Sequence, residues 1–223
     1  MTKILAIETS SDVCSVALTD GRSDYSFHEL MPRQHTEELL GVIEGLLKSA
    51  SLTIKNIDAV AVGCGPGSFT GIRLACATAQ GISFSQNIRG IVVPSLEILA
   101  SKVNRLESVE KIVSIVDANM GRLYIGKYTY SGKLLKNAEI KSIPKGDFNP
   151  DNYDEETFFV GEGCRLVQDL IETVSNQIRI DMPSALELLN IAKAKHGENE
   201  TVISEQILPI YLTEESNWVK SWW

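Results

Sequence analysis

The glycine-rich segment at residues 63–73, GCGPGSFTGIR, is the strongest local signal for chemistry. It follows an apolar run and precedes a helical pattern, and backbone N–H groups at such a junction can bind an anion. The spacing matches neither a Walker A loop nor GxGxxG, nor GxSxG around Ser68. A tight turn that needs glycine for positive φ and close packing explains the same residues, and spacing alone favours that interpretation.

Two acids, Glu8 and Asp117, each end an apolar run that reads as a buried strand. Two carboxylates in corresponding turns could hold a metal-bound nucleotide. A cap on the turn that follows each strand explains them more simply, since the second half of the chain is short for a nucleotide cleft. The candidate vestigial nucleotide or anion site comprises Glu8, Gly65, Gly67, Ser68 and Asp117.

The other side chains that could do chemistry form no recognisable catalytic or metal-binding pattern. The three histidines show no HExxH spacing, and the four cysteines form no CxxC pair, so we expect reduced thiols and no metal site. No nucleophile stands near a base in sequence, although the fold could supply one. His35 is either a hydrogen-bonding residue at a helix start or an interface residue. We therefore predict no catalytic residue and no metal ligand.

The composition is that of an acidic globular protein. The 223 residues carry a formal net charge of −8, and the 21 lysines and arginines are scattered. A protein that binds nucleic acid by itself usually has a basic face, so another subunit should hold any RNA. We find no signal peptide and no apolar run long enough for a membrane span, and we expect a cytoplasmic protein.

The elements that position these residues form a repeated α/β pattern. The first half reads βββ-α-β-α-β-α, the half-unit of the ribonuclease-H and actin-like architecture. The pattern restarts near residue 112, which indicates a degenerate duplication with a period of roughly one hundred residues. The expected strands are residues 3–8, 14–19, 23–30, 59–63, 90–93, 112–117, 122–130, 135–143, 157–160 and 207–212, and the expected helices 36–47, 72–84, 95–103, 165–174 and 184–195.

We predict two lobes, residues 1–104 as the partner-binding lobe and a smaller lobe of residues 105–223. The tail, residues 202–223, could return to the first lobe. Its three tryptophans, Trp218, Trp222 and Trp223, could anchor a partner, pack on the chain's own surface or be disordered.

Two helices of the first lobe have more apolar or small-residue surface than one core needs. The first has an apolar arc of roughly 160° from Leu39 to Leu47, which predicts burial by a second molecule. The second carries Gly71, Ala75 and Ala79 four residues apart, an arrangement that permits close approach of another backbone.

Four segments together resemble the TsaB (YeaZ) family. They are ILAIETSSDVCSVAL at residues 4–18, PRQHTEELL at 32–40, GCGPGSFTGIRLACATAQG at 63–81 and DANMGRLY at 117–124. Their order and spacing match the family, GPGSFTGxR is distinctive, and the resemblance thins to a general pattern beyond about Tyr130.

The resemblance implies a two-lobed actin-like ATPase (ribonuclease-H-like) fold, a mixed sheet flanked by helices. It also implies a scaffold role beside the paralogous catalytic subunit TsaD and the ATPase TsaE. That complex adds a threonylcarbamoyl group to the adenosine beside the anticodon in tRNAs that read ANN codons, and TsaC supplies the activated group. ATP and metal would then belong to partner subunits, with no cofactor in this chain. Ser95 and Leu99 stand where TsaD carries its two metal-binding histidines.

The resemblance places the partner face on the first two helices. The partners would be a TsaD-type subunit, a TsaE-type ATPase and a second copy of the chain, with no strong direct tRNA binding and no membrane. An arginine at Leu39 or Ala75 should then break dimerisation and leave the monomer folded. The implied interface residues are His35, Glu38, Leu39, Val42, Leu46, Ser68, Phe69, Thr70, Arg73, Ala75 and Ala79.

Two enzymatic alternatives remain open at this point. One is an ATP-dependent phosphotransferase or carbamoyltransferase of the same fold, which would use Glu8, Asp117 and residues 65–70 around a metal nucleotide. The other is a metallopeptidase, which the lack of ligands disfavours.

Overall fold

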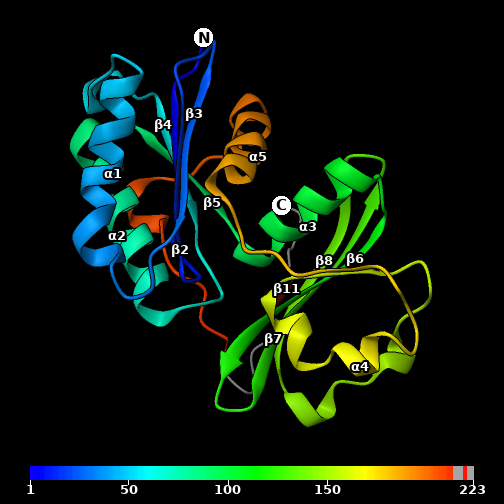
Figure 1. Cartoon of the computed structure of the whole chain (residues 1–223). Helices are drawn as coiled ribbons and strands as arrows, with labels where there is room; N and C mark the ends of the chain where they lie inside the picture. Colours follow the sequence, from blue (N-terminus) through cyan, green and yellow to red (C-terminus); the bar gives the residue numbers. More distant parts are fainter. Residues whose placement is uncertain (213–217, 220–223) are drawn as a thin grey trace. The chain divides into compact units, whose positions relative to one another are not determined.

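The computed structural model describes residues 1–212, 218 and 219. The chain divides into two compact units. The first comprises Met1–Ile98 and Pro183–Ile210, and the second comprises Leu99–Met182 and the described residues from Tyr211 onward (Figure 1). Each unit is built around its own sheet.

The first unit has a five-stranded mixed sheet in the order β3-β2-β1-β4-β5. β1 pairs antiparallel with β2 and parallel with β4, because only β1–β2 and β2–β3 are joined by tight turns. The strands are β1 (Ile4–Glu8), β2 (Val13–Thr19), β3 (Asp24–Leu30), β4 (Ala59–Gly63) and β5 (Arg89–Val93).

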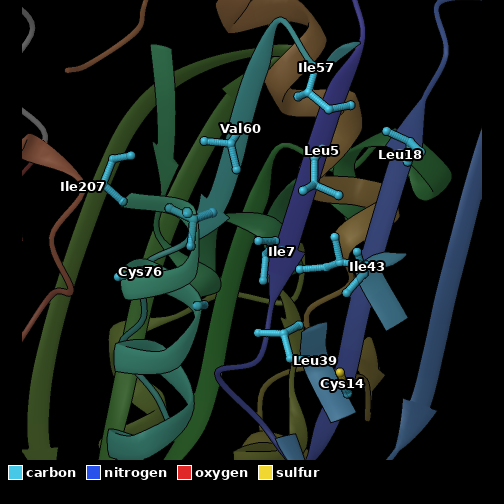
Figure 2. Packing of buried hydrophobic residues seen from close by; sticks show 14 of the residues in the cluster. Leu5, Ile7, Cys14, Leu18, Leu39, Ile43, Ile57, Val60, Cys76 and Ile207 are labelled. Carbon is cyan, nitrogen blue, oxygen red and sulfur yellow. The ribbon is translucent and has the colours of Figure 1, made fainter. Parts of the chain in front are cut away.

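Helices cover both faces of this sheet, with α1 (His35–Ser49) and α2 (Phe69–Gln86) on one side and α5 (Ala185–Gly197) on the other (Figure 1). Leu5 and Ile7 of β1 face α1 and α2, as Figure 2 shows, whereas Ile4 and Ala6 face α5. Because successive strand residues point to opposite faces, a strand covered on both sides must be apolar throughout. This explains the unbroken apolar run before Glu8.

The second unit repeats the same topology. Its sheet has the order β10-β9-β6-β7-β8-β11, and its first five strands copy the order and directions of the first sheet. The duplication predicted from the sequence is therefore confirmed. The strands are β6 (Lys111–Asn119), β7 (Arg122–Ser131), β8 (Leu134–Pro144), β9 (Phe158–Val160), β10 (Ile178–Arg179) and β11 (Trp218–Val219).

The second copy has less helix than the first. Where the sequence predicts one helix at residues 165–174, the chain forms a 3-10 turn followed by α4 (Gln168–Ile171), and α3 (Ser95–Glu107) crosses from one unit to the next. The core under α4 includes Phe148, Phe159 and Ile171. The 3-10 helices of the chain are η1 (Ile54–Asn56), η2 (Lys145–Asp147), η3 (Pro150–Asn152), η4 (Glu162–Leu166) and η5 (Ser204–Gln206).

The unit boundaries differ from the predicted division at residue 104. Residues 183–210 belong to the first unit, because Ala185, Leu188 and Leu189 of α5 pack on the sheet face that carries Ile4 and Ala6. Sequence order assigned that helix to the second lobe, since it cannot show which sheet a late helix covers.

Residues 202–210 belong to the first unit, whereas the strand predicted at residues 207–212 is absent. Val202 bridges to Gly90 of β5, and Ile207 lies where a side chain at position 90 would stand. β11 then pairs with Glu139 and Ile140 of β8 in the second unit. Trp222 and Trp223 lie outside the described residues.

Candidate functional site

The glycine loop between β4 and α2 is packed against the turn that follows β1. A Cβ at Gly67 would overlap Ser10, and a Cβ at Gly71 would overlap the carbonyl oxygen of Thr9. The backbone N–H of Ser68 donates to the Ser10 carbonyl at 2.7 Å. The glycines thus allow close approach of the chain's own backbone, which supports the tight-turn interpretation of this segment.

Glu8 lies at the centre of this packing and is fully buried. Its Oε1 accepts from the Ser10 backbone N–H at 2.6 Å, and its Oε2 accepts from the Ser95 hydroxyl at 2.8 Å. Ser95 Oγ in turn accepts from the Gly65 N–H at 3.1 Å. A Cβ at Gly63 would overlap the Glu8 carboxylate, so this position also requires glycine.

Burial raises the pKa of Glu8 above its ordinary value, and hydrogen bonds from Ser10 and Ser95 and the nearby His35 only partly offset the effect. The carboxyl group ties the end of β1 to the glycine loop and to the start of α3. The geometry favours an internal structural role over a metal–nucleotide ligand.

Asp117 lies two residues before the end of β6, near the corresponding place in the second unit. Its Oδ1 accepts from the Asn119 backbone N–H at 2.7 Å, so the half-exposed side chain caps the β6–β7 turn. Asn119, Met120 and Gly121 all have positive φ in this turn. Glu8 and Asp117 belong to different units, and each satisfies its own turn.

Ser95 and Leu99, which stand where TsaD carries its metal-binding histidines, are both engaged inside the fold, and the cysteine thiols are buried. Ser95 binds Glu8, and Leu99 is buried in the core. Among residues 1–212, 218 and 219, no group of three His, Cys, Asp or Glu side chains could hold a metal ion. The four cysteines are buried free thiols, and burial raises the pKa of Cys14 to about 11 and of Cys76 to about 12, which disfavours the reactive thiolate.

The predicted interface residues divide into an outward and an inward group. Glu38, Ser68, Phe69, Thr70 and Arg73 are exposed, and Val42 and Leu46 are half-buried. The Arg73 guanidinium lies 3.5 Å from the centroid of the Phe69 ring, so these two side chains form one preordered surface feature.

Leu39, Ala75 and Ala79 were wrongly assigned to the partner face. All three are fully buried in the core between α1, α2 and the sheet (Figure 2 shows Leu39). On α1 the inward stripe runs through Leu39, Ile43 and Leu47 at intervals of four residues. A charge at Leu39 or Ala75 would therefore damage the fold itself.

His35 begins α1 and is also largely buried. Its Nε2 has no hydrogen-bond partner among the described residues, and the ring is close enough to Glu8 to affect its charge state. Its burial argues against an exposed interface contact, but no hydrogen bond of the ring within the described part of the chain supports the helix-start alternative.

The outward face of α1 and α2 contains residues that the sequence reasoning missed. Leu40 is 66% exposed and Phe84 is 73% exposed. Gly41 and Gly45 of α1, and Gly81 of α2, have open space where a Cβ would stand. These residues lie one or two positions beyond the inward stripes. That offset in the 3.6-residue period is the signal that could have identified them.

A duplicated βββαβα unit of this topology defines the ribonuclease-H-like class with an actin-like duplication. A sequence model of the TsaD family, tRNA N6-adenosine threonylcarbamoyltransferase, matches residues 28–193. Two solved Pseudomonas aeruginosa structures superpose with TM-scores of 0.83. One is YeaZ, 32% identical, covering 95% of this chain and all of that one. The other, described as similar to the peptidase YeaZ, is 30% identical and covers 96% of this chain.

Curated relatives extend over the whole chain. The Haemophilus influenzae protein named tRNA threonylcarbamoyladenosine biosynthesis protein TsaB is 31% identical, covering 97% of this chain and 96% of its own length. The Escherichia coli protein of the same name is 30% identical over 98% and 97%. The chain belongs to the TsaB (YeaZ) family. No helix in the described part of the chain is long and apolar enough to cross a membrane.

Proposed function

We propose that the chain is a non-catalytic scaffold in the biosynthesis of tRNA threonylcarbamoyladenosine, where it binds and activates a TsaD-type catalytic subunit. The observation that carries this proposal is the burial and internal hydrogen bonding of Glu8, the acid at the end of β1. Glu8, the residue best placed to act on a metal nucleotide, is buried and bonded to Ser10 and Ser95. In this proposal ATP and metal belong to partner subunits, and the protein works in the cytoplasm with its tRNA substrate.

The outward face of α1 and α2 is the surface that we assign to the catalytic subunit. It exposes Leu40, Phe69 and Phe84 as apolar contacts. Gly41, Gly45 and Gly81 lack side chains and have open space where a Cβ would stand, so a second helix pair can approach closely. Because the chain also matches the TsaD family model, a paralogous half-unit could present a similar helix pair, so the same face suits a homodimer and a heterodimer.

The test is reconstitution of the modification with one component omitted at a time. Unmodified tRNA, threonine, bicarbonate and ATP are combined with the TsaC-, TsaD- and TsaE-type proteins and this chain. Product is then measured by mass spectrometry. We expect product to require this chain, to survive Glu8→Gln and Asp117→Ala, and to fall more than tenfold with Ala77→Arg on the exposed face of α2.

The outcomes distinguish a scaffold from an ATP-dependent transferase. Loss of product with Asp117→Ala, while the complex still assembles, would identify an ATP-dependent transferase instead of a scaffold. Product formed without this chain would remove the proposed role altogether. Thr78→Ser, a conservative change on the same helix, serves as the matched control for Ala77→Arg.

A further inference from the structure

The β7–β8 hairpin concentrates positive charge in an acidic protein. Residues 122–145 contain six of the 21 lysines and arginines, and Glu139 is the only carboxylate among them. The cations are separated by neutral residues in the sequence, which is why they looked scattered. The pairing of β7 with β8 brings the two strands side by side, so the expectation that the lysines and arginines are scattered is wrong for this hairpin.

Four of these cations follow β8 from one end to the other. Lys133 precedes the strand, Lys136 and Lys141 lie on it, and Lys145 follows it. Across the described residues, the one carboxylate within ion-pair range of these four is Glu139, 4.0 Å from Lys141. A surface pair at that distance contributes little, so the charge of the strip is mostly uncompensated.

One cation of β7, Lys127, also lies beside this strip. Lys127 stands opposite Glu139 in the strand register, and its ammonium lies 4.7 Å from the centroid of the Tyr153 ring. Burial lowers the pKa of Lys127, the nearby Lys141 lowers it further, and Glu139 partly offsets both effects. A bound anion would relieve the repulsion between the two lysines.

Two acidic side chains of this unit are held at a different strand. Asp154 and Glu156 both bind Lys111 of β6, at 2.7 and 2.8 Å. The loop that carries them lines a cleft with residues of β6 and β7, and no residue of β8 lines it. Asp154 and Glu156 therefore pair with Lys111 of β6, and none of the four lysines that follow β8 lines the same cleft.

We propose that the strip formed by Lys133, Lys136, Lys141 and Lys145, the β8 strip, binds the phosphate backbone of RNA. At ~3.3 Å per strand residue its ends are about 40 Å apart, too far for one small anion but suited to a chain of phosphates. Contacts to phosphates carry no sequence information, so binding is non-specific and weakens with salt. The choice of RNA among polyanions rests on the proposed function.

Lysines on an outer strand have a second known role, which the experiment must separate from RNA binding. Among the residues that the structure describes, β8 pairs on its outer side with the two residues of β11. Charged side chains protect such an edge from pairing with another sheet. Glutamate is also charged and so also disfavours pairing at an edge. Reversal of the charge therefore preserves the protective role and removes phosphate binding.

The experiment measures binding of a fluorescein-labelled, unmodified tRNA transcript by fluorescence anisotropy from 50 to 300 mM KCl. The full chain is compared with K133E/K136E/K141E. The control R22E/K55E/R89E makes the same change in net charge at exposed positions of the first unit. We expect the β8 variant to bind at least tenfold more weakly at 50 mM KCl and the control to change less than threefold. The salt slope should fall by about 2–3, since each lost phosphate contact removes roughly 0.7–0.9.

Three results would overturn the proposal that the β8 strip binds RNA. They are no tRNA binding by the wild-type chain at 50 mM KCl, wild-type affinity of K133E/K136E/K141E, or a loss of affinity in the control as large as that in the β8 variant. A pull-down with the TsaD-type subunit tests the proposed function independently, and we expect the β8 variant to pass it. If the chain binds RNA through the β8 strip but the reconstituted reaction forms product without the chain, the scaffold proposal fails and the proposal of RNA binding stands.

Discussion

Glu8 shows how the surroundings of one residue decide between a catalytic and a structural carboxyl group. From the sequence, an acid at the end of the first strand suits a metal nucleotide. In the folded chain the Ser10 N–H and the Ser95 hydroxyl occupy its two oxygens, and Gly63 leaves room for it. A buried carboxyl that is held in this way connects three elements and offers no open ligand position.

The raised pKa of Glu8 predicts a specific pH dependence of stability. The folded state holds the proton more tightly than the unfolded chain, so the free energy of unfolding falls as pH rises from the unfolded pKa of about 4.5. Glu8→Gln carries no titrating proton there. Its stability relative to wild type should therefore increase as the pH rises from 4.5 to 7.5, as measured by urea unfolding. Asp151→Asn, at an exposed site, is the control, and a pH-independent difference for Glu8→Gln would contradict the assignment.

Gly63→Ala tests the same packing without changing a charge. The added Cβ overlaps the Glu8 carboxylate, and overpacking of this kind costs about 1–3 kcal/mol in the free energy of unfolding. Gly146→Ala, where a Cβ meets open space, should have little effect. Equal unfolding midpoints for the two variants in urea would show that the carboxyl can move away at no cost.

At the scale of elements, α1 and α2 each have to serve two surfaces. Leu39, Ile43 and Leu47 hold α1 on the sheet, while Leu40, Gly41 and Gly45 face outward. The sequence revealed that the apolar arc of α1 is too wide for one core. It did not reveal where the inward part ends, because the two stripes are only one or two residues apart and packing on the sheet decides which residues face inward.

The two stripes predict opposite effects of substitution on the first helix. Leu39→Ala should lower the free energy of unfolding by about 2–5 kcal/mol, since it opens a cavity in the core. Leu40→Ala should leave stability within about 0.5 kcal/mol but weaken association, because it removes an exposed contact. Urea unfolding and sedimentation equilibrium measure the two effects. If Leu40→Ala leaves association unchanged and Leu39→Ala weakens it without loss of stability, the orientation of the helix is wrong.

At the scale of the whole molecule, the duplication could be predicted from the sequence, whereas the unit boundaries could not. Strand order follows from the repeated βββ pattern and its turns, which are local signals. The position of α5 depends on the apolar face formed by Ile4 and Ala6, almost two hundred residues earlier in the chain. The basic hairpin was missed for a related reason, since pairing of β7 with β8 gathers cations that the sequence separates.

The distant contribution of α5 makes a clear prediction about fragments of the chain. Met1–Ile98 alone would expose the sheet face that Ala185, Leu188 and Leu189 cover, so it should aggregate or show no cooperative unfolding. The same fragment joined by a Gly/Ser linker to Pro183–Ile210 should unfold cooperatively in urea. Replacing Leu188 and Leu189 with Ser in the joined fragment should abolish that transition, whereas Lys193→Ser at an exposed position should not. Cooperative unfolding of Met1–Ile98 by itself would mean that the first half-unit folds without its late helix, and that the boundary predicted from sequence order is the better description of folding.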